Sequence, residues 1–180
     1  MFDWDEIERT ANGGRSKDYA PNGEYTTKIA SIKVQDNPNW KSPCFDMTWQ
    51  ENDQYQFPKS VRHWLPLGNE NFRRFHARAV LMELGITKEQ AQKAVETAEK
   101  DTSREALVKG YQQVFDRAVS RYPEVKIVVR DQLRDGKPVK SDKGTTYSES
   151  DFANRPAGLG QEQPKAPALA DDIDPSEIPF

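Results

Sequence analysis

The chain has 180 residues and a net charge of −3, and 35% of its residues are hydrophobic and 31% charged. This length accommodates one domain with a core and an appendage, but not comfortably two domains. No apolar run approaches the roughly 20 residues that cross a bilayer, and the acidic N-terminus lacks a signal-peptide pattern. The single cysteine excludes an internal disulfide and a cysteine-based zinc cage, so we expect a cytoplasmic protein.

The negative charge is concentrated near the C-terminus. From Gln161 to Phe180 there are five acidic residues and one basic residue, which together carry −4 and leave +1 for residues 1–160. A nearly neutral body would bind nucleic acid through locally grouped basic residues rather than through its overall field.

Alternating apolar residues predict three strands in the first part of the chain. They cover residues 23–34, 45–50 and 60–67. In the first strand the apolar parity changes between Ile29 and Ile32, which indicates a β-bulge. In the third strand Arg62 and Trp64 share one face, opposite the apolar parity.

The apolar period then changes to that of helices. A first helix carries an apolar stripe from Phe72 to Met82 and ends at Gly85, a typical C-terminal cap. Capping-box patterns that begin at Thr87 and Thr102 predict two further helices.

Two more strands are predicted after the helices, at residues 124–131 and 145–152, with a long basic loop between them. Three strands, a helical connection and two strands are the layout of an OB-fold. We therefore predict a mainly β protein of the α+β class. Its five-stranded antiparallel OB-fold barrel would occupy residues 1–153, with a helical insertion over about 69–122 between strands 3 and 4.

From Ala153 the chain is rich in Pro, Gly, Gln and Ala, which predicts a disordered linker over 154–170 and an acidic tail over 171–180. A terminal Phe180 offers a ring beside a free carboxylate, which suits an apolar pocket rimmed by Arg or Lys. Pro179 lowers the ordering cost of docking. The predicted protein-docking residues are Asp171, Asp172, Asp174, Glu177, Ile178, Pro179 and Phe180.

This ending resembles that of bacterial single-stranded-DNA-binding proteins, which finish with a Pro/Gln/Gly-rich linker, an acidic cluster and Ile-Pro-Phe. The body looks more like phage-encoded members, with Gly23-Glu24-Tyr25 opening the first strand. The resemblance implies a protein of the bacterial host cytoplasm whose tail recruits replication, recombination and repair enzymes. The tetramer of bacterial members is not carried over, and a homo-oligomer remains one option.

Aromatic and basic residues suggest where single-stranded DNA would bind, because bases stack on rings while Lys and Arg contact phosphates. Trp49 is in phase with core residues, and we expect it to be buried. The basic loop after the fourth strand corresponds to a loop that flanks the OB-fold groove. The predicted DNA-binding residues are Lys33, Trp40, Lys41, Tyr55, Lys59, Arg62, Trp64, Lys126, Arg130, Arg134, Lys137, Lys140 and Lys143.

No catalytic motif is present in the sequence, and we expect a non-enzymatic protein without cofactor or metal. His63 and His76 lack metal-ligand spacing, and we expect both to be structural. Two alternatives stay open. One is an OB-like adaptor that binds protein or duplex nucleic acid, and the other is a metal-dependent nuclease that uses Asp46, Glu51 and Asp53.

Overall fold

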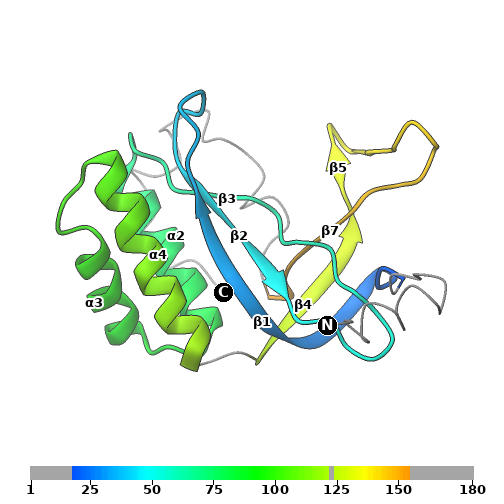
Figure 1. Ribbon diagram of the computed structural model, residues 1–180, viewed down its shortest axis with the longest axis horizontal. Coiled ribbons are helices and arrows are strands. Elements are labelled where there is room, and N and C mark those ends of the chain that lie inside the picture. The colour runs from blue at the N-terminus through cyan, green and yellow to red at the C-terminus, as the bar shows by residue number, and fades with distance from the viewer. Residues whose placement is uncertain (1–17, 122–123, 155–180) are drawn as a thin grey trace, which may run out of the picture.

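The computed structural model describes residues 18–121 and 124–154, and it belongs to the α+β class. A five-stranded antiparallel sheet has the order β3-β2-β1-β4-β7, and β5 and β6 form a separate two-stranded sheet. Within these residues three helices lie together on one side of the sheet, and the β5–β6 hairpin projects from the other side (Figure 1). The strands are β1 Gly23–Gln35, β2 Cys44–Trp49, β3 His63–Trp64, β4 Glu124–Asp131, β5 Leu133–Arg134, β6 Lys137–Pro138 and β7 Ser148–Phe152. The helices are α2 Glu70–Glu83, α3 Lys88–Ala98 and α4 Arg104–Arg121.

Strand β1 is the centre of the sheet and bends between two partners. Its first half, from Gly23 to Lys28, pairs with β4, and its second half pairs with β2. The register with β2 shifts between Ile29 and Ser31. This irregularity confirms the bulge that the change of apolar parity predicted, because an extra residue moves the following side chains to the other face.

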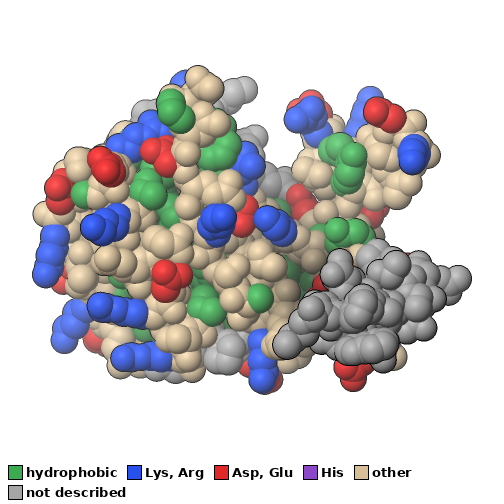
Figure 2. Space-filling model, in the orientation of Figure 1, with side chains coloured by type: hydrophobic (Ala, Val, Ile, Leu, Met, Phe, Trp, Pro, Cys, Tyr) green, Lys and Arg blue, Asp and Glu red, His purple; other side chains and the backbone are tan. Residues whose placement is uncertain are grey.

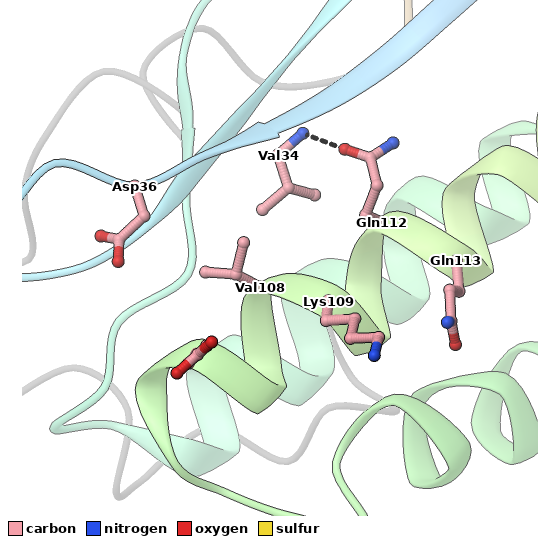
Figure 3. A pocket seen from close by; sticks show the side chains of 7 residues that line it. Val34, Asp36, Val108, Lys109, Gln112 and Gln113 are labelled. Carbon is pink, nitrogen blue, oxygen red and sulfur yellow. Dashed lines mark hydrogen bonds between the residues drawn. The ribbon is translucent and has the colours of Figure 1, made fainter.

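The edge of β1 beyond its pairing with β4 is covered by a side chain of α4. Gln112 Nε2 donates to the carbonyl oxygen of Ile32 at 2.9 Å, and Gln112 Oε1 accepts from the amide of Val34 at 2.8 Å. Figure 3 shows the amide reaching from α4 to Val34. Gln112 therefore satisfies the backbone groups that a neighbouring strand would otherwise pair.

The third predicted strand is much shorter than expected. Only His63 and Trp64 pair with β2, whereas the prediction covered 60–67. Two amides before β3 bond to different strands: Ser60 N–H donates to Met47 O on β2, and Val61 N–H donates to Ser150 O on β7. The segment divides its hydrogen bonds between two strands, which shortens β3.

The outer strands β3 and β7 do not close the described sheet into a barrel. One isolated parallel bridge joins Ser60, which precedes β3 in the chain, to Ser150 of β7. Trp49 Nε1 donates to the Ser150 hydroxyl, which in turn donates to Pro58 O at 2.7 Å. Side chains and single bridges, rather than a continuous ladder, thus join the two edges.

The helices form where their caps predict, with small differences. The capping box of Thr87 with Gln90 is present at the start of α3. Helix α4 begins at Arg104, later than the predicted box at Thr102, and Asp101 Oδ1 accepts the amide of Ser103 just before it. Gly85, after α2, has φ of +81°, a conformation that favours glycine.

A buried carboxylate holds the helices together. Glu99, the C-cap of α3, accepts from Arg73 Nε on α2 at 2.8 Å and from the Tyr111 hydroxyl on α4 at 2.5 Å. Arg74 Nε also donates to it at 2.7 Å. The Glu99 and Arg73 side chains are only 1% and 3% exposed, so the charges neutralise each other inside the helical layer.

The apolar faces of the sheet and of the helices meet in one core. Phe45 of β2 packs against Phe115 of α4, with ring centroids 4.6 Å apart. Trp49 is 3% exposed and lies in the same core, as its phase with Phe45 and Met47 predicted. None of the helices within 18–121 has the length and apolar character that crossing a membrane requires.

Candidate nucleic-acid interface

The outward face of β1, β2 and β3 brings together residues from all three strands. Lys33 lies opposite Asp46, and Cys44 lies opposite Trp64. Residues directly opposite in antiparallel strands share a face. Cys44 and Asp46 also share a face, because they are two residues apart on β2, and Phe45 between them faces the other way. Lys33 and Trp64 therefore point away from the core that Phe45 lines.

Two tryptophans and an arginine form a cluster on this face. The ring centroids of Trp40 and Trp64 are 5.6 Å apart, with the planes at 81°. The guanidinium carbon of Arg62 lies 4.6 Å from the centroid of Trp40 and 5.7 Å from that of Trp64. Both rings are half-buried and Arg62 is exposed. We call these three residues the Trp–Arg cluster.

The cluster combines the two kinds of group that single strands require. The indole rings offer faces for stacking, and the guanidinium offers donors in a planar fork that fits a phosphate. Arg62 is already held near both rings by cation–π attraction, which keeps the cation beside the stacking surface. The structure thus juxtaposes Trp40, Arg62 and Trp64, which lie 24 positions apart at most in the sequence.

Cys44 shares this face with Trp64 but is fully buried. Burial raises the pKa of its thiol to about 11, although the nearby Arg62 opposes this shift. The thiol therefore stays protonated at neutral pH, and its role is packing.

The predicted basic loop is an ordered arm, residues 132–147, rather than an irregular loop. Arg134 pairs with Lys137 across a turn formed by Asp135 and Gly136, whose φ angles are 51° and 74°. Two positive φ values are typical of a type I′ hairpin turn. Further along, Gln132 N–H donates to Tyr147 O, which closes the base of the arm.

The arm displays basic, aromatic and aliphatic side chains. Arg134, Lys137, Lys140 and Lys143 are all exposed. Leu133 is 48% exposed and Tyr147 is 50% exposed, which is high for side chains of this size. Figure 2 shows the arm as a separate projection, with hydrophobic and charged side chains on its surface and a notch between it and the body. Tyr147 is a candidate stacking residue that the sequence reasoning did not include.

Several predicted residues lie apart from these two regions. Tyr55 packs against Tyr25, with ring centroids 6.3 Å apart, on the edge of the core. Arg130 is held in an ion pair with Glu149 at 2.9 Å. Lys59 and Lys126 are exposed, and Lys41 is exposed directly after Trp40 in the chain. The predicted tail, 171–180, lies outside the described residues.

The two histidines lie in the core. His63 Nδ1 and His76 Nε2 are 3.3 Å apart, and His63 Nε2 lies 3.5 Å from Asp151 Oδ1. His63 stacks on Phe45, with 12° between the planes. All three polar residues are almost completely buried, and their contacts join β3, α2 and β7.

The acids near Asp46 do not assemble a metal site. Asp46 accepts from Gln35 Nε2 at 2.5 Å, and Glu51 and Asp53 lie in the exposed connection after β2. Within 18–121 and 124–154, no group of three or more His, Cys, Asp or Glu residues is placed to hold a metal ion.

Comparisons of the chain with protein-family models, with curated proteins and with solved structures found no match.

Proposed function

We propose that the protein binds single-stranded DNA on the outward face of β1, β2 and β3, with the Trp–Arg cluster as the centre of the site. The observation that carries this proposal is the placement of Arg62 within 6 Å of two half-buried indole rings on one strand face. Stacking on aromatic rings and phosphate contact by basic residues are the main sources of single-strand affinity. Lys33 on the same face adds a further cation.

The arm supplies the second part of the proposed site. Between Leu133 and Tyr147 there are four basic and two acidic residues, so this segment is net positive although the whole chain is negative. The turn between β1 and β2 and the arm project toward the same end of the molecule in Figure 1. A strand of DNA that stacks on the Trp–Arg cluster would then continue toward the basic arm.

We further propose that the sheet is an OB-like barrel that is incompletely closed. The order of strands, the bulge in β1 and the helices between β3 and β4 all fit this layout. The parallel bridge of Ser60 with Ser150 lies where the third and last strands of such a barrel would meet. In this view the arm is the loop that flanks the groove.

The acidic tail completes the proposal. We propose that Ile178, Pro179 and Phe180 dock into partner proteins of replication, recombination or repair, in the cytoplasm of a bacterial host. The support is the combination of an apolar tripeptide with the acids that precede it. The origin in a phage is part of the same proposal and rests on the resemblance of the body.

Replacing the rings tests the site. Trp40→Ala and Trp64→Ala should each weaken binding of a fluorescent oligo(dT) by roughly 1–3 kcal/mol, because each loses one stacked base. Trp64→Phe, which keeps a smaller ring, should lose less. Fluorescence anisotropy gives the affinity, and circular dichroism checks the fold.

Unchanged affinity in both folded alanine variants would remove the Trp–Arg cluster from the site. If the wild-type protein showed no salt-sensitive binding to oligo(dT) at all, the adaptor alternative would be preferred. Cleavage of the oligonucleotide on addition of Mg²⁺ or Mn²⁺ would instead favour a nuclease.

A further inference from the structure

Arg104, the first residue of α4, holds the turn that carries Trp40. Its Nε donates to Asp36 Oδ2 at 2.9 Å and its Nη2 to Asp36 Oδ1 at 2.5 Å, so the ion pair is bidentate. Nη2 also donates to the carbonyl oxygens of Asn37 at 3.0 Å and Trp40 at 2.8 Å. One guanidinium thus binds the beginning and the end of the turn.

An open hollow lined by Val34, Asp36, Val108 and Lys109 lies between the end of β1 and the helix (Figure 3). Within the turn, Trp40 N–H donates to Asn37 O at 2.9 Å, and this bond fixes the position of the Trp40 backbone relative to Asn37. Polar bonds to Arg104 therefore set the place from which the Trp40 ring extends.

We propose that Asp36 and Arg104 form a positioning clamp that orders Trp40 beside Trp64 before nucleic acid binds. This inference rests on the proposed function. A ring that is already in place loses less conformational entropy on binding than a ring on a loose turn. The smaller entropy cost makes the binding free energy more favourable. Arg104 is a positioning residue in this proposal, because its Nε and Nη2 groups are engaged with Asp36 and the two carbonyls.

The clamp and simple electrostatics predict opposite effects of removing the Asp36 carboxylate on the affinity for oligo(dT). Removing an acid near a DNA site should tighten binding if only charge matters. If the clamp matters, Asp36→Ala should weaken oligo(dT) binding roughly two- to tenfold. Glu105→Ala is the matched control, since it removes the same charge from an exposed position next to Arg104 and should leave binding equal or tighter.

Arg104→Lys separates positioning from phosphate contact. It keeps the charge but loses the planar fork, so it should weaken binding as Asp36→Ala does. The dependence of log K on log salt should keep its slope in both variants, because no phosphate contact is lost. The Asp36–Arg104 pair is about one-third exposed, so both variants should fold.

A double-mutant cycle gives the decisive readout. In a Trp40→Ala background, Asp36→Ala should have no further effect, because the clamp acts through that ring. Tighter binding by Asp36→Ala, or an equal loss in both backgrounds, would overturn the clamp. If instead the wild type does not bind or Trp40→Ala binds normally, it is the proposed function that fails, so the two failures are distinguishable.

Discussion

Tyr147 extends the candidate interface from the sheet onto the arm. Its side chain is half exposed on the same arm as Leu133 and four basic residues, and an exposed phenol ring can stack on a base. Tyr147 falls within the strand that the sequence predicted over 145–152. The alternation of apolar residues could not show that this residue belongs instead to a projecting arm. By contrast, alternation alone assigned Trp49 to the core and Trp64 to the outward face, because each lies on a paired strand.

Tyr147→Ala should weaken oligo(dT) binding by roughly 1–3 kcal/mol. Its effect on the free energy of unfolding should stay within about 0.5 kcal/mol, because the side chain is exposed. The control is Tyr19→Ala, which removes a 61% exposed ring elsewhere and should change neither quantity. Anisotropy and chemical denaturation measure the two quantities, and equal DNA affinity for both variants would exclude Tyr147 from the site.

At the scale of elements, the fold depends on hydrogen bonds that no local pattern encodes. The bulge in β1 was predictable because it shifts the parity of side chains within one strand. The short β3 was not, because Ser60 and Val61 bond to strands about 13 and 90 positions away in the sequence. The contacts of the Glu99 carboxylate with α2 and α4 could not be predicted either, because the apolar period of a helix says nothing about which polar side chains meet.

Glu99→Gln should destabilise the protein by about 3–5 kcal/mol at neutral pH, because it leaves Arg73 buried without its counter-ion. Burial alone would raise the pKa of Glu99, but hydrogen bonds from Arg73, Tyr111 and Arg74 hold it below its ordinary value of 4.5. The stabilisation is therefore present above about pH 4.5 and is lost as the pH falls through the lowered pKa.

Urea denaturation from neutral pH to about pH 3 measures this dependence. The difference in unfolding free energy between wild type and Glu99→Gln should shrink toward the acid end, where the protonated acid resembles the amide. Glu96→Gln, an exposed change on the same helix, serves as the control. A difference that stayed constant over this range would contradict the assignment of the charge to Glu99.

At the scale of the whole molecule, the charge is divided between a nearly neutral body and an acidic C-terminal segment. The distribution of charged residues along the sequence showed this division, and the periodicity of the apolar residues predicted the α+β class with five antiparallel strands and a helical insertion. The sequence also predicted a closed barrel, which the structure does not show, because an isolated bridge between Ser60 and Ser150 joins the two edges instead of a continuous ladder.

The proposed tail should have two separable effects. Deleting residues 171–180 should tighten DNA binding modestly at low salt, because tethered acids compete with phosphate for basic residues, and the gain should shrink as salt is added. Deleting Phe180 alone should abolish recruitment of replication and repair proteins in pull-downs while DNA affinity barely changes. Intact recruitment without Phe180 would reduce the tail to a solubilising segment.

The central claim is that single-stranded DNA stacks on the Trp–Arg cluster, and intrinsic fluorescence tests it most directly. Titration with poly(dT) at low salt should quench tryptophan emission saturably, because bases would cover Trp40 and Trp64. In the double variant Trp40→Phe/Trp64→Phe most of this quenching should disappear. Absence of any saturable change in the wild-type protein, or undiminished quenching in the folded double variant, would contradict the account.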